Sequence, residues 1–91
     1  MANQTALSAL NAIHPILWQT RFRKLTLEDL RELRRLTHLL ERMPVEVPNF
    51  NEAARTFSTM LHDSDEFETG TLAKMDQFLE YVELLQEMLK S

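Results

Sequence analysis

The chain has 91 residues, which is the size of one small domain, and a net charge of −4. It contains no cysteine and one glycine, which excludes a disulfide scaffold, a cysteine nucleophile and a glycine-rich phosphate loop. The uncharged stretch 1–20 is too polar for a membrane span and lacks the basic start of a secretory signal, so we expect a cytoplasmic protein.

Apolar residues recur at spacings of three and four along the whole chain, and no strand-like alternation interrupts them. This pattern predicts an all-α fold in a single domain, 1–91. The short connections favour a small four-helix antiparallel bundle or a related orthogonal helical array. The predicted helices cover residues 5–23, 27–43, 50–62 and 71–90.

The helix over residues 5–23 contains a proline on its polar side. Pro15 removes one backbone hydrogen bond, so we expect a kink near Pro15 or a new helix that starts there. Trp18 and Phe22 are bulky side chains near its end, suited to core packing or to contact with a partner. The predicted buried face consists of Ala6, Leu10, Ile13 and Leu17.

The helix over residues 27–43 has the clearest start. Thr26 followed by Asp29 is a variant of the capping box, and Leu25 and Leu30 occupy the hydrophobic-staple positions. Pro44 ends the helix. The predicted buried face consists of Leu33, Leu36, Leu40 and Met43.

The helix over residues 50–62 is predicted to start in a similar way. Asn49 can cap it and Glu52 can return the hydrogen bond. Its apolar residues cover about a third of the circumference and predict one buried face. They are Phe50, Ala53, Ala54, Phe57, Met60 and Leu61.

The start of the last helix has two solutions. Thr69 or Thr71 can cap it, with Gly70 in a turn, which gives a helix over 71–90. Alternatively, Ser64 caps a helix that begins near 64. The second solution places Gly70 inside the helix at a cost of about 1 kcal/mol, so we favour the first.

Apolar residues cover about 200° of this last helix, roughly twice what one core contact requires. Tyr81, Leu84 and Met88 form a second ridge beside the first. Either the helix is central and covered on two sides, or the second ridge binds another copy or a partner. The first ridge consists of Met75, Phe78, Leu79, Val82, Leu85 and Leu89.

Charge is distributed unevenly along the chain. Residues 21–42 carry a net charge of +3 and residues 43–91 carry −7. The two charged rows could face each other across a symmetric interface, or both could be solvated. The acidic row is Asp76, Glu80, Glu83 and Glu87, and the basic row is Arg31, Arg34, Arg35, His38 and Arg42.

The pattern of ionisable residues predicts no enzyme, no metal site and no cofactor. His14, His38 and His62 lack the spacing of a helical metal face, and the acidic stretch 63–68 does not fit a calcium-binding loop. Nucleic-acid domains usually carry a strong basic excess, whereas this chain has a pI near 5.3.

We therefore expect a non-enzymatic protein–protein interaction module, such as a regulator, inhibitor or chaperone-like adaptor, that binds through a helix face and forms a homodimer. Binding to a membrane is not expected. The alternative is a nucleic-acid-binding regulator that uses the basic stripe of the first two helices, chiefly Arg31, Arg34, Arg35 and Arg42. The predicted interface residues are Tyr81, Leu84, Met88, Trp18 and Phe22.

Overall fold

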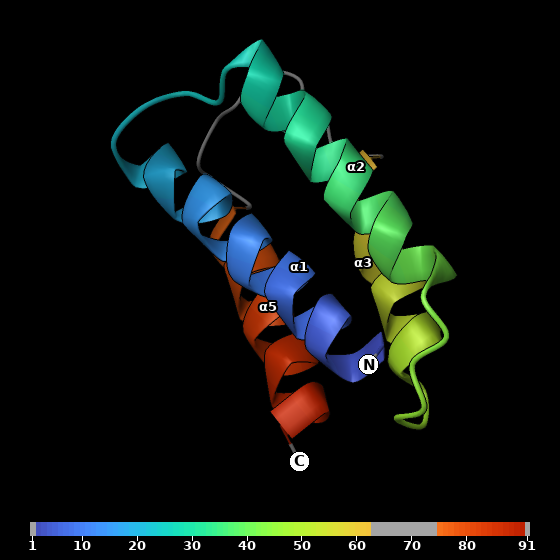
Figure 1. Ribbon diagram of the computed structural model, residues 1–91. Helices are drawn as coiled ribbons and strands as arrows, with labels where there is room; N and C mark the ends of the chain where they lie inside the picture. The colour runs from blue at the N-terminus through green and yellow to red at the C-terminus, as the bar shows by residue number, and fades with distance from the viewer. Residues whose placement is uncertain (1, 63–74, 91) are drawn as a thin grey trace.

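Four α-helices make up most of the computed structural model, which describes residues 2–62 and 75–90. They are α1 (Ala2–Trp18), α2 (Leu27–Arg42), α3 (Phe50–His62) and α5 (Met75–Lys90). Each described helix runs roughly opposite to the one before it, as Figure 1 shows. The predicted all-α helical bundle is confirmed.

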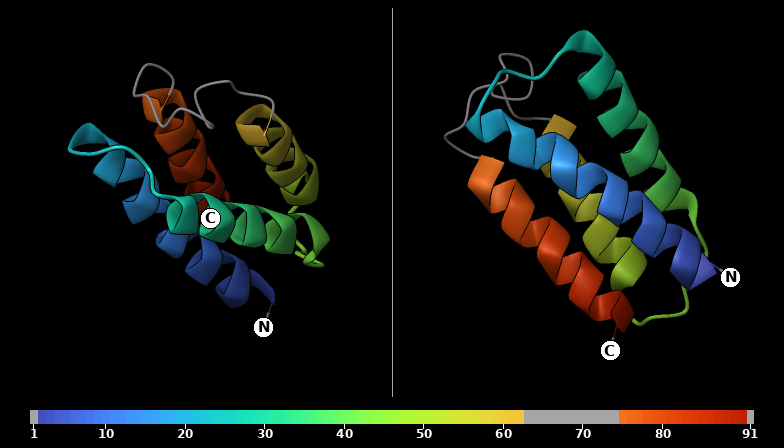
Figure 2. Two further views of the ribbon diagram at one scale, coloured as in Figure 1. Left: turned by 90° about the horizontal axis from the view of Figure 1, so that it is seen from above. Right: turned by 60° about the vertical axis from the view of Figure 1, so that its left-hand side comes forward.

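The helices form a closed ring around one apolar core. α1 lies between α2 and α5, and α3 completes the ring by packing against the same two helices (Figure 2). The predicted apolar faces point inward, since their spacing puts each on one side of its helix. The largest fully buried side chains are Phe50, Phe57, Leu10, Ile13, Leu17, Leu33, Leu40, Leu61, Leu85 and Val82.

α1 is displaced toward the N-terminus relative to the predicted 5–23. It begins at Ala2 and gives way after Trp18 to a 3₁₀ turn, Gln19–Arg21. The hydroxyl of the buried Thr20 donates to the carbonyl oxygen of Leu17 at 2.6 Å within this tighter turn. Pro15 lies inside α1 on an exposed position, so a new helix starting there is wrong, while the kink stays a prediction.

The start of α2 confirms the predicted capping box. The Asp29 amide donates to Thr26 Oγ1 at 3.1 Å, and the Thr26 amide donates to the Asp29 carboxylate at 3.0 Å. Both Leu25 and Leu30 pack half-buried against the core, as the staple predicts. The helix ends at Arg42, one residue early, because the residue before Pro44 is forced into an extended conformation.

α3 has the predicted bounds but a different start. Asn49 has a φ of 68°, a left-handed conformation that asparagine tolerates, whereas a capping residue such as Thr26 is extended. The reciprocal hydrogen bonds expected between Asn49 and Glu52 are therefore not formed. Asn51 instead donates through Nδ2 to the Met43 carbonyl oxygen at 2.8 Å and ties α3 to the end of α2.

The start of α5 cannot be compared with the prediction, because both proposed starts, near 64 and at 71, lie outside the described residues. Within the described part, α5 runs to Lys90. Its buried side chains are Phe78, Leu79, Val82 and Leu85, all members of the predicted first ridge.

Thr26→Ala should lower the free energy of unfolding by about 1 kcal/mol, because the Asp29 amide at the start of α2 loses its acceptor, Thr26 Oγ1. Urea denaturation followed by circular dichroism measures this. Thr56→Ala is the matched control, because the Thr56 hydroxyl donates a hydrogen bond only to the Glu52 carbonyl oxygen of its own helix. Equal losses in the two variants would contradict a stabilising role for the box.

Candidate interaction surface

The second ridge of α5 is only partly covered by the bundle. Tyr81 and Met88 are half-buried and pack against the core, whereas the Leu84 side chain is 53% exposed. The Tyr81 ring stacks on Phe57 of α3 with 5.8 Å between ring centroids. The side of α5 that carries the ridge is therefore turned toward α3.

α3 adds exposed apolar surface on the same side. Met60, predicted to be buried, is 37% exposed, because it lies beside Ala53 on the edge of α3 rather than at its centre. The pairing of α3 with α5 is the least extensive of the four helix pairings in the ring. We call the resulting surface the α3–α5 strip; it consists of Ala53, Met60, Tyr81, Leu84 and Met88.

The opposite side of α5 is closed by polar contacts to α1 and to the 3₁₀ turn that follows it. Asp76 and Glu83, half of the predicted acidic row, take part in them, Asp76 with Arg21 of the turn and Glu83 with His14 of α1, rather than with the arginines of α2. The distances join Arg21 Nη2 to Asp76 Oδ1 at 2.8 Å, His14 Nε2 to Glu83 Oε1 at 3.6 Å, and Gln86 Nε2 to Asn11 Oδ1 at 2.9 Å. Spacings of three and seven place Asn11, His14 and Arg21 on one side of α1 and of the turn after it, a signal that the sequence analysis missed.

Trp18 lies next to the polar contacts that join α5 to His14 and Arg21. Its ring stacks on His14 with 6.3 Å between centroids, and the guanidinium carbon of Arg21 lies 4.4 Å from its ring centroid. Trp18 is 46% exposed and Phe22 is 78% exposed. Since Leu84 lies on the other side of α5, the structure separates the predicted interface residues into two surfaces.

The predicted basic row lies on the outside of α2. Arg35 donates from Nε and Nη2 to the two carboxylate oxygens of Glu32, which lowers the pKa of Glu32 and raises the pKa of Arg35. Arg31 and Arg42 are exposed and form no ion pair with the residues that the structure describes. Arg34 is also exposed. The row is thus partly neutralised by its own helix.

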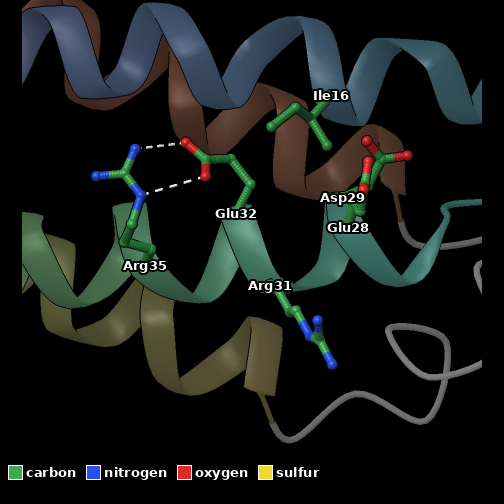
Figure 3. A pocket seen from close by; sticks show the side chains of 6 residues that line it. All are labelled: Ile16, Glu28, Asp29, Arg31, Glu32 and Arg35. Carbon is green, nitrogen blue, oxygen red and sulfur yellow. Dashed lines mark hydrogen bonds and ion pairs between the residues drawn. The ribbon is translucent and has the colours of Figure 1, made fainter.

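A pocket opens between α1 and the first half of α2. In Figure 3, Glu32 and Arg35 pair at one end and Glu28 and Asp29 lie at the other, whereas Arg31 points away from all three acidic side chains. Opposite charges line it in nearly equal number, so it lacks the set of convergent groups that a small-molecule site needs. The lining residues are Ile16, Glu28, Asp29, Arg31, Glu32 and Arg35.

Asp29, which lines this pocket, is part of the capping box that stabilises the start of α2. Partial burial raises the pKa of Asp29, but the hydrogen bonds from Thr26 and Arg23 outweigh this, so its pKa lies below the usual 3.8. Arg23 Nη1 lies 3.1 Å from Asp29 Oδ2. The carboxylate therefore joins the loop before α2 to its first turn.

Two of the three histidines meet in space, which sequence spacing did not indicate. The rings of His38 on α2 and His62 on α3 stack with 5.4 Å between centroids, and His62 Nε2 lies 3.3 Å from Thr37 Oγ1. His38 also approaches Glu41 at 3.2 Å. Across residues 2–62 and 75–90, no three His, Cys, Asp or Glu side chains are grouped so as to hold a metal ion.

Comparison with known proteins adds no further constraint on this surface. Neither a protein-family model nor a curated protein nor a solved structure shows significant similarity to the chain. Among the helices that the structure describes, none has the length and apolar character needed to cross a bilayer.

The contribution of Asp29 to stability should depend on pH. Because its pKa is lowered in the folded state, the stabilisation is fully present above pH 3.8 and is lost as the pH falls through the lower folded-state value. The difference in unfolding free energy between the wild type and Asp29→Asn should therefore be largest at neutral pH and shrink in acid. Urea denaturation at several pH values measures it.

Glu28→Gln is the control, because it removes a carboxylate from the same helical turn without breaking the capping box. A difference between wild type and Asp29→Asn that stays constant down to pH 2 would contradict the assignment.

Proposed function

We propose that this chain is a non-enzymatic protein–protein interaction module, such as a cytoplasmic regulator, inhibitor or chaperone-like adaptor, that binds a partner through a helix face. The exposure of Leu84 on the α3–α5 strip is the observation that carries the proposal. Fully burying an exposed leucine side chain contributes about 1.5–3 kcal/mol, and about half of the Leu84 side chain is left for a partner to cover. Its neighbours Tyr81 and Met88 extend the apolar area.

The strip has the layout of a recognition surface. Tyr81 is held in place by its stacking on Phe57, while methionine side chains adapt to different partner shapes. A helix laid along this strip would meet apolar groups from both α3 and α5. Self-association into a homodimer through the same strip stays a prediction.

Leu84→Glu should abolish partner binding and any self-association through the strip while leaving helicity unchanged, because the side chain lies on the surface. Light scattering across concentration and co-purification from the native host measure these two effects. Leu39→Glu is the matched control, since Leu39 is also exposed but lies on α2, away from the strip.

If both variants behave like the wild type in both measurements, the strip is not a binding surface. If Leu84→Glu unfolds the protein, Leu84 belongs to the core in solution, which also contradicts the proposal.

Nucleic-acid binding is a second candidate function, favoured by the exposed Arg31 and Arg42 on the outer face of α2. Binding of a short DNA duplex should then fall steeply with salt, because each neutralised phosphate releases counterions. Replacing Arg31, Arg34 and Arg35 with alanine should remove the binding. An absence of measurable binding by the wild type at low salt would exclude this candidate.

A further inference from the structure

The connection between α1 and α2, at the end of the bundle away from the C-terminus (Figure 1), exposes apolar side chains that the fold does not use. Phe22 is 78% exposed and Leu27 is 63% exposed, more than any other large apolar side chain among the residues that the structure describes. Neither belongs to the core or packs against it, whereas Leu25 and Leu30 of the staple do pack against it. A replacement of Phe22 or Leu27 should therefore leave the fold intact.

Two unpaired charges of opposite sign lie beside these apolar side chains. Lys24 lies two residues after Phe22, and Glu28 directly follows the exposed leucine. Both Lys24 and Glu28 are exposed and form no ion pair with the residues that the structure describes. Arg31, one turn further along α2, points away from Glu28 (Figure 3). We call this surface the α1–α2 end patch; it consists of Phe22, Lys24, Leu27 and Glu28.

The remaining charges of residues 19–29 are already paired. Arg21 Nη2 lies 2.8 Å from Asp76 Oδ1, and Arg23 Nη1 lies 3.1 Å from Asp29 Oδ2. The end patch thus presents one unpaired cation and one unpaired anion. A strongly acidic or strongly basic partner would match one of these charges and repel the other.

A patch with one charge of each sign can be complementary to its own copy. In a symmetric dimer the same surface meets itself, so each residue of the patch meets a different residue of the second copy. When the two connections run antiparallel, Lys24 of one copy faces Glu28 of the other. The same alignment brings Phe22 of one copy toward Leu27 of the other. Each unpaired charge then gains an opposite charge, and each exposed apolar side chain gains an apolar neighbour.

From these observations we infer that two copies of this chain form a symmetric dimer through the α1–α2 end patch. Contacts between Phe22 and Leu27 supply the apolar burial, which drives the association. Two pairs between Lys24 and Glu28, related by the twofold axis, set the orientation more than the affinity.

The end patch is separate from the α3–α5 strip, so the inference goes beyond the proposed function. Arg21 of the connection contacts Asp76 in the first turn of α5. Leu84 lies about two helical turns further along α5, on the side turned toward α3. A dimer through the end patch therefore leaves the strip free for another partner.

Sedimentation velocity tests the dimer with the protein alone. The wild type should change from monomer to dimer as its concentration rises to about 1 mM. The double variant Phe22→Ser with Leu27→Ser should stay monomeric with unchanged helicity, since neither side chain packs against the core. Leu39→Ser is the matched control, because it removes an exposed leucine of α2 outside the patch, and it should dimerise like the wild type.

Charge exchange tests the predicted pairing. Lys24→Glu and Glu28→Lys should each raise the dimer dissociation constant about tenfold, because each change turns both attractive pairs of the symmetric dimer into repulsive ones. The two changes combined exchange the charges and restore the pairs, so the dissociation constant should return to within about threefold of the wild-type value. A combined variant that associates no better than the single ones overturns the inference.

The remaining outcomes separate the inference from the proposed function. A wild type that stays monomeric up to about 1 mM, or a dimer that survives Phe22→Ser with Leu27→Ser, overturns the inference and leaves the strip unaffected. A dimer that Leu84→Glu dissociates also overturns it, but supports the proposed function, because the contact then runs through the strip. A dimer that persists in Leu84→Glu and is lost in the Phe22 and Leu27 double variant supports the inference, even if no partner binds the strip.

Discussion

The burial of α5 between α1 and α3 is the constraint on which the rest of the structure depends. Its apolar circumference is wider than one neighbour can cover, so the helix must be sheltered on two sides. Polar contacts close the α1 side, whereas on the α3 side Tyr81 stacks on Phe57 and Leu84 stays exposed. The incomplete closure on the α3 side creates the apolar strip.

The ring order of the helices also determines how charge is displayed. Because α2 and α5 are diagonal, the arginines of α2 and the acids of α5 face opposite sides of the bundle. Some charges are paired with neighbours in the same chain, as in the Arg35–Glu32 and Arg21–Asp76 ion pairs. These pairs contribute little to the stability of the fold because they are exposed. Glu80 and Glu87 are exposed and neighbour Leu84 on the surface of α5.

Part of the candidate site could be predicted from the sequence. The excess apolar residues on the last helix indicated an unusual surface, and Leu84 is where it is exposed. The sequence could not distinguish Leu84 from Tyr81 and Met88, because all three share one side of the helix and differ only in how α3 covers them. For the same reason Met60 was wrongly predicted to be buried.

The sequence by itself determined the helices, the capping box at Thr26 and the inward faces, because spacing and local hydrogen bonds act within a few residues. Only the tertiary structure decided that Glu83 pairs with α1 and Asp76 with the turn after it, and that the strip and the Trp18 surface are separate. These features depend on which helices are neighbours in the ring, and residues far apart in the chain set that order.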